Sequence, residues 1–180
     1  MTAVAEWAAA LGPATGRLRV VAVEGRSGAG KSGFADTLAA ALGASLIRMD
    51  EIYPGWDGLL AAVTTVHDRV LVPLAAGRPA RWRLWDWAND GPGQWHEVPA
   101  TDNLVVEGVG CGARALRPYT SGLVWIEAPE AVRHRRAMAR DGDTYAPHWR
   151  RWARQEEAFY RANDVRGRAD LIIENDRENP

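Results

Sequence analysis

Residues 25–32 combine three glycines, two serines and one lysine in a spacing that suits phosphate binding. The segment fits the pattern G-x-x-x-x-G-K-S/T at each fixed position and reads Gly25-Arg26-Ser27-Gly28-Ala29-Gly30-Lys31-Ser32. Glycines let backbone N–H groups turn inward around a phosphate, and a helix that starts behind the loop adds the positive end of its dipole. The residues expected to bind a nucleotide here are Gly25, Ser27, Gly28, Ala29, Gly30, Lys31, Ser32 and Gly33.

Lys31 is the only lysine among the 22 lysine and arginine residues of the chain. Lysine is a point charge on a flexible stem, whereas arginine is a planar fork, so the two do not substitute freely inside a tight loop. We expect Lys31 to reach the β- and γ-phosphates and to act in catalysis, and we expect the Ser32 hydroxyl to bind Mg²⁺.

Two carboxylates follow short apolar runs elsewhere in the chain. Asp50 ends the run 45–49, where it could accept the proton of an attacking hydroxyl; the alternative is a turn or helix-capping aspartate. Glu107 follows Leu104-Val105-Val106, a position from which a carboxylate can hold Mg²⁺ directly or through water. We therefore predict Asp50 as a catalytic base and Glu107, with Ser32, as the metal site.

Three arginines late in the chain share one helical face. Arg133, Arg136 and Arg140 are spaced i, i+3 and i+7, so their guanidiniums could clamp phosphates and neutralise charge in a transition state. Asp141-Gly142-Asp143 then breaks the pattern, as a closing lid over about residues 133–148 would require. The alternative is a solvated basic face on an arginine-rich protein.

The elements that must position these residues alternate between strand and helix. Short apolar runs at 18–23, 45–49, 104–106, 123–126 and 170–173 predict five strands, and helical spacing predicts helices over 32–42, 59–76, 129–140 and 147–161. Such alternation predicts an α/β fold of three layers with a five-stranded parallel sheet. Asp50 and Glu107 then lie with Gly25 at the carboxyl edge of the sheet, where ligands bind.

Composition limits the remaining possibilities. The 180 residues suit one domain over 1–180, the net charge of −1 gives no general attraction to nucleic acid, and no run is long and apolar enough for a membrane span. The one cysteine, Cys111, suits a cytoplasmic protein and a small apolar role. We expect a small-molecule partner and a monomer or homodimer.

Residues 78–100 read as irregular and hold four tryptophans. The rings could sandwich a planar substrate, or they could form a small core beneath a long loop. Nearby arginines, among them Arg83, leave a phosphorylated substrate open. Single-stranded nucleic acid is disfavoured because acidic residues interrupt the segment.

Taken together, the motifs resemble the P-loop kinases of the uridine kinase and phosphoribulokinase group. The D-x-F-Y pattern of that group appears as Asp50-Glu51-Ile52-Tyr53, its E-G as Glu107-Gly108, and its lid pattern R-x-x-R-R-x-x-R-D as residues 133–141 with Ala137 in place of one arginine. The nucleoside-binding Y-D-F-x-x-H-x-x-R corresponds to residues 85–93, where the histidine and arginine positions hold Asp90 and Gly93.

The resemblance implies an ATP-dependent kinase that uses Mg²⁺ and phosphorylates a hydroxyl of a nucleoside or related metabolite. It implies substrate contacts at Asp50, Tyr53, Arg83, Trp85 and Asp86. The alternative is a nucleotide-binding protein or regulatory NTPase without phosphotransfer to a small molecule. A GTPase of the usual kind is excluded because its N-K-x-D motif needs a second lysine.

Overall fold

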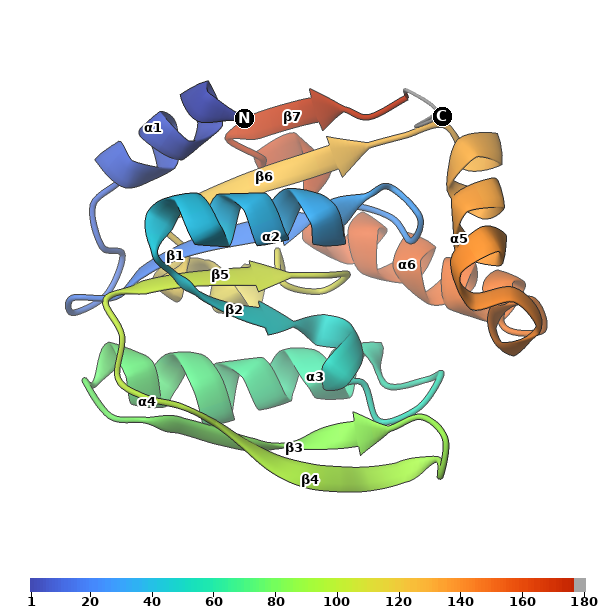
Figure 1. Cartoon of the computed structure of the whole chain (residues 1–180), viewed down its shortest axis with the longest axis horizontal. Coiled ribbons are helices and arrows are strands. Elements are labelled where there is room, and N and C mark those ends of the chain that lie inside the picture. The colour runs from blue at the N-terminus through green and yellow to red at the C-terminus, as the bar shows by residue number, and fades with distance from the viewer. Residues whose placement is uncertain (177–180) are drawn as a thin grey trace.

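The computed structural model describes residues 1–176, which fold around a central parallel sheet (Figure 1). The strands lie in the order β2-β5-β1-β6-β7, and each pairs with its neighbours in parallel. Their bounds are β1 (Arg19–Glu24), β2 (Ser45–Arg48), β5 (Asn103–Glu107), β6 (Gly122–Glu127) and β7 (Leu171–Glu174). The five predicted strands and the α/β class are confirmed.

Helices cover both faces of the sheet, which gives the predicted three layers (Figure 1). One face carries α1 (Thr2–Ala10) and α2 (Lys31–Leu42); the other carries α3 (Leu59–Thr65), the π-helical η2 (Val66–Leu71), α4 (Val72–Ala75) and α6 (Trp149–Asn163). Along β1, Val21 and Val23 join the core beneath α2, while Val20 and Ala22 join the opposite core. A central parallel strand is buried on both sides, which is why its sequence is apolar throughout.

The predicted helix over 59–76 is present but widens in its middle. The backbone passes from α3 through the π-helical η2 into α4, and Pro73 lies in the first turn of α4. Proline has no N–H to donate and its ring clashes with the carbonyl four residues earlier, so the preceding turn widens.

The prediction that residues 78–100 are irregular is wrong. Strands β3 (Ala80–Asp86) and β4 (Gly91–Val98) pair as an antiparallel hairpin that lies beside α3 and α4 (Figure 1). In β3, Ala80 and Trp82 are buried, while Arg81 and Arg83 are exposed. Alternation of buried apolar and exposed charged residues is typical of a half-buried strand. Residues 80–83 show this alternation in the sequence itself.

Three short 3-10 segments and one kinked helix complete the described chain. They are η1 (Met49–Glu51), η3 (Arg114–Tyr119), η4 (Arg166–Arg168) and α5 (Glu130–Tyr145). The predicted break is present as a kink within α5: Gly142 has non-helical φ and ψ of 48° and −128°, with helical turns on either side of it. Within residues 1–176, no helix is both long and apolar enough to cross a membrane.

Candidate active site

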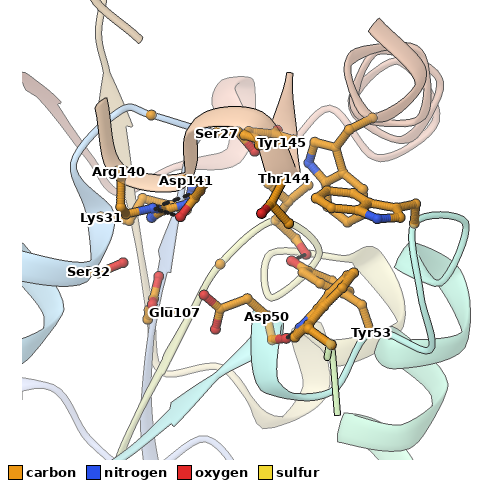
Figure 2. A pocket seen from close by; sticks show the side chains of 16 residues that line it. Ser27, Lys31, Ser32, Asp50, Tyr53, Glu107, Arg140, Asp141, Thr144 and Tyr145 are labelled. Atoms are coloured by element: carbon orange, nitrogen blue, oxygen red, sulfur yellow. Dashed lines mark hydrogen bonds and ion pairs between the residues drawn. The ribbon is translucent and has the colours of Figure 1, made fainter. Parts of the chain in front are cut away.

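A cavity of about 710 Å³ opens at the carboxyl edge of the sheet, between the glycine-rich loop and the kinked end of α5 (Figure 2). Its lining includes Lys31 and Ser32 of the loop, Asp50 of η1, Glu107 at the end of β5 and Arg140 of α5. The parallel strands bring these side chains together because their carboxyl ends lie at one edge. The glycine-rich loop, the two carboxylates and the lid arginine Arg140 therefore lie together around one cavity, as the sequence predicts.

The glycine-rich loop is wrapped around its own lysine. Lys31 begins α2, is 8% exposed, and donates from Nζ to the carbonyl of Arg26 at 3.1 Å. Gly28 and Gly30 have φ of 80° and 94°, which L side chains rarely adopt. A Cβ at Gly28 would also collide with the Arg133 backbone. The loop thus leaves backbone N–H groups and one buried ammonium at the start of a helix, which is an arrangement that binds anions.

Glu107 is the buried carboxylate of the site. Burial raises its pKa, Lys31 opposes that shift, and the neighbouring Asp50 carboxylate adds to it. A hydrogen bond from Ser32 also favours the charged form. Figure 2 shows Ser32 and Glu107 on the same side of the cavity, with Asp50 across from them. Hydroxyl and carboxylate oxygens in this grouping are the donors that Mg²⁺ prefers, so the residues fit the ion.

Asp50 lies exposed at the mouth of the cavity, and its backbone is fixed from a distant segment. The indole Nε1 of Trp87 donates to the Asp50 carbonyl at 2.8 Å. Tyr53, one turn further on, is buried and donates from its hydroxyl to the Val109 carbonyl at 2.7 Å. The segment that carries Asp50 is therefore held both by the hairpin and by the loop after β5.

Glu24 is a buried carboxylate that we did not predict. It ends β1, directly before the glycine-rich loop, and is fully buried. Its oxygens accept the N–H groups of Gly110 (2.8 Å), Gly112 (2.9 Å) and Gly25 (3.2 Å) and the hydroxyl of Tyr160 (2.9 Å). Burial raises its pKa to about 7, against the opposing effects of the hydrogen bonds from Gly112, Gly25 and Tyr160 and of the Lys31 charge. Glu24 ties the loop to the segment after β5.

Glu156 on α6 holds the glycine-rich loop from the other side. Its Oε1 accepts the backbone N–H of Ser27 at 2.8 Å and the indole N–H of Trp152 at 3.0 Å. Its second oxygen lies 3.8 Å from the Arg26 guanidinium. Helix α6 thus fixes the loop, and no spacing pattern in the sequence indicates this contact.

The three predicted lid arginines differ in their surroundings. Arg140 lines the cavity and forms hydrogen bonds with the Asp141 carboxylate at 2.6 to 3.0 Å. Arg133 is buried and donates to the carbonyls of Ala128 (3.0 Å) and Ser27 (3.3 Å), so it supports the loop from beneath. Arg136 donates to the Asn175 carbonyl at 3.0 Å and does not line the cavity.

The hairpin residues predicted to contact substrate lie outside the cavity lining. Arg83 donates to the carbonyls of Gly93 and Pro92 at 2.7 and 2.8 Å. The Asp86 carboxylate accepts N–H groups of its own turn, between Asp86 and Asn89. Trp85 also lies outside the lining. Of the hairpin, the described lining includes Trp87 in the turn and no residue of β3 or β4.

No protein-family model and no curated protein matches the sequence, but solved structures match the fold. The structure of a possible uridine kinase from Bacillus stearothermophilus has a TM-score of 0.69 at 19% identity and covers 96% of each chain. The chain therefore shares the fold of that structure, a five-stranded parallel sheet between layers of helices. A shikimate kinase from Acinetobacter baumannii (TM-score 0.51, 18% identity, 97% of this chain and 89% of that one) and a gluconokinase from Sinorhizobium meliloti (0.51, 16%, 92% and 86%) share it.

Within this fold, several cavity residues had no sequence signal of their own. Trp56, Trp87, Thr144, Tyr145 and Trp152 line the cavity together with the predicted Tyr53. They come from segments far apart in the chain, so no local spacing could group them. Glu24 is different, because it follows an apolar strand just as Glu107 does. Applying the same rule to the first strand would have found it.

Proposed function

We propose that this protein is a small-molecule kinase that transfers the γ-phosphate of ATP to an acceptor hydroxyl. The observation that supports it is the shared cavity: Asp50 faces the space in which Lys31 and Ser32 end. A phosphate-binding loop alone would suit any nucleotide-binding protein. A carboxylate on the opposite wall, open to a second molecule, suits transfer between two substrates.

The side chains divide the work of phosphoryl transfer between them. Lys31 and the loop N–H groups would hold the β- and γ-phosphates, and Arg140 would neutralise charge on the transferred group after leaving Asp141. Ser32 and Glu107 would hold Mg²⁺, which would neutralise part of the phosphate charge. The acceptor oxygen forms its bond to phosphorus as the bond to the ADP oxygen breaks. The hydroxyl proton passes to Asp50.

Replacing the base tests the proposal directly. Asp50→Asn keeps the size of the side chain and removes its ability to take a proton, so phosphoryl transfer should fall by about 10² to 10⁴-fold while ATP still binds. Asp102→Asn is the matched control, because Asp102 is exposed and pairs with Arg17 just before β5. ADP release would be followed with an acceptor present, and ATP affinity by calorimetry.

The same pair of variants addresses the alternative function. A nucleotide-binding protein without transfer would bind ATP in all three forms and release no acceptor-dependent ADP in any of them. Equal turnover of wild type and Asp50→Asn would remove Asp50 from the role of base.

A further inference from the structure

A second, smaller cavity lies at the amino ends of β6 and β7, apart from the candidate active site. Its volume is about 140 Å³, compared with about 710 Å³ for the active-site cavity, and the two share no described lining residue. Sites for ordinary metabolites and nucleotides occupy roughly 300–1,000 Å³, so this cavity suits a single small ion. Its lining residues are Gly112, Ala113, Arg117, Thr120, Ser121, Leu123, Arg168 and Asp170.

The cavity carries positive charge that no direct ion pair neutralises. Arg168 is held in place by hydrogen bonds that its Nε and Nη2 donate to the backbone carbonyls of Asn163 and Gly112. Burial lowers the pKa of the Arg168 guanidinium, and the nearby charges of Arg114 and Arg117 lower it further. Within residues 1–176, neither Arg117 nor Arg168 forms an ion pair with a carboxylate. A bound anion would therefore relieve repulsion between these like charges.

The donors in the lining suit an oxyanion. A guanidinium is a planar fork whose N–H groups match two oxygens of one anion, and Arg117 brings such a fork to the cavity. The Ser121 Oγ accepts the N–H of Val20 at 3.3 Å, which leaves its own O–H to donate. Thr120 differs, because its hydroxyl donates to the Leu116 carbonyl at 3.0 Å. Arginine and serine are thus the side chains that can donate to an anion here.

One carboxylate in the lining restricts which oxyanion can bind. Asp170 accepts the N–H of Leu123 at 2.8 Å through Oδ2, and its side chain also lines the cavity. An ionised carboxylate accepts hydrogen bonds and donates none, so it repels an anion that carries no proton. Sulfate is such an anion near neutral pH, and a phosphomonoester, with a second pKa of about 6, has also lost its proton. Inorganic phosphate keeps a P–OH group that can donate to Asp170.

We propose that this cavity, here called the second anion site, binds inorganic phosphate. The forks of Arg117 and Arg168 and the Ser121 hydroxyl donate to its unprotonated oxygens. Its remaining P–OH donates to Asp170. The proposal does not depend on the kinase function, because no residue of the active-site cavity takes part.

Calorimetric titration with inorganic phosphate at constant ionic strength tests the site. Arg117→Gln should raise the Kd of phosphate about 10-fold or more, since a charge-assisted hydrogen bond is lost. Arg114→Gln, which removes a nearby charge from outside the lining, should have a smaller effect. Arg78→Gln is the matched control, because Arg78 is exposed just before β3 and its loss changes the net charge equally.

The glycine-rich loop could itself bind phosphate, so the titrations are repeated in Lys31→Ala. We expect the binding that depends on Arg117 to remain in this background. Absence of phosphate binding in wild type, or a wild-type Kd in Arg117→Gln, would overturn the proposal. Loss of all phosphate binding in Lys31→Ala would place the anion at the glycine-rich loop and would overturn it as well.

The choice of ion tests the role of Asp170. Wild type should bind phosphate about 10-fold or more tightly than sulfate, because sulfate has no proton to donate to the carboxylate. Asp170→Asn keeps an oxygen for the N–H of Leu123 and removes the negative charge, so its affinity for sulfate should rise and the preference should shrink. Asp102→Asn, an exposed aspartate outside the lining, is the control. Equal affinities of wild type for the two ions would refute the assignment of inorganic phosphate.

Discussion

Glu24 offers the sharpest test of the structure, because its carboxyl is fully buried and its pKa is raised to near neutral pH. Burial raises its pKa from 4.5 to about 7. Three backbone N–H groups and the Tyr160 hydroxyl stabilise the charged form by hydrogen bonds. These hydrogen bonds do not fully offset the loss of hydration on burial. The predicted perturbation is Glu24→Gln, which keeps the shape of the side chain and cannot ionise.

The direction of the effect follows from the pKa of Glu24 in the unfolded and folded chain. Below pH 4.5 the carboxyl is protonated in both states, and its full contribution to stability is present. As pH rises from 4.5 towards about 7, the unfolded chain loses the proton first, so the free energy of unfolding falls. Between pH 5 and pH 8 this loss amounts to about 2–3 kcal/mol, because a tenfold difference in proton affinity between the two states corresponds to about 1.4 kcal/mol.

Urea unfolding at several pH values between 5 and 8 measures this loss. The wild-type curve contains the titration of every group, so the informative quantity is wild type minus Glu24→Gln. That difference should fall by about 2–3 kcal/mol over the range. Glu97→Gln, an exposed glutamate of β4, controls for the loss of one carboxylate. If the free energies of unfolding of wild type and Glu24→Gln changed with pH in parallel, the raised pKa of Glu24 would be refuted.

Three further predictions concern the glycine-rich loop. Mg-ATP should protect Lys31 from acylation and leave the N-terminal amine reactive; equal labelling of Lys31 with and without Mg-ATP would exclude its contact with phosphate. Glu156→Ala should lower the free energy of unfolding by about 1.5–3 kcal/mol, since charged hydrogen bonds to Ser27 and Trp152 are lost, whereas Glu157→Ala, with a side chain 54% exposed, should cost less than half of that. Gly28→Ala should weaken ATP binding about 10-fold or more by calorimetry because of its φ of 80° and the collision with Arg133, while Gly33→Ala, where a Cβ meets nothing, should bind normally.

Local chemistry explains which parts of the site could be predicted. A phosphate-binding loop is contiguous, so Gly25 to Ser32 can be recognised from spacing alone. A parallel sheet places strand ends at one edge, so the grouping of Asp50 and Glu107 with the loop followed from the predicted strands. That reasoning did not extend to Arg83 and Asp86, which lie outside the described cavity lining, because residues 78–100 read as irregular and the side each residue faces could not be predicted.

The sequence by itself determined the fold class, the loop and the polar edge, since each depends on neighbouring residues or on strand ends. Only the tertiary structure decided how far each charge is buried and which rings meet. Glu24 is an ordinary carboxylate until the Gly110 segment and α6 exclude water from it, which is what raises its pKa. Tyr53 and Trp152 are distant in the sequence, yet their rings meet edge to face with centroids 4.7 Å apart. Desolvation and long-range packing are properties of the assembled core, and no local pattern encodes them.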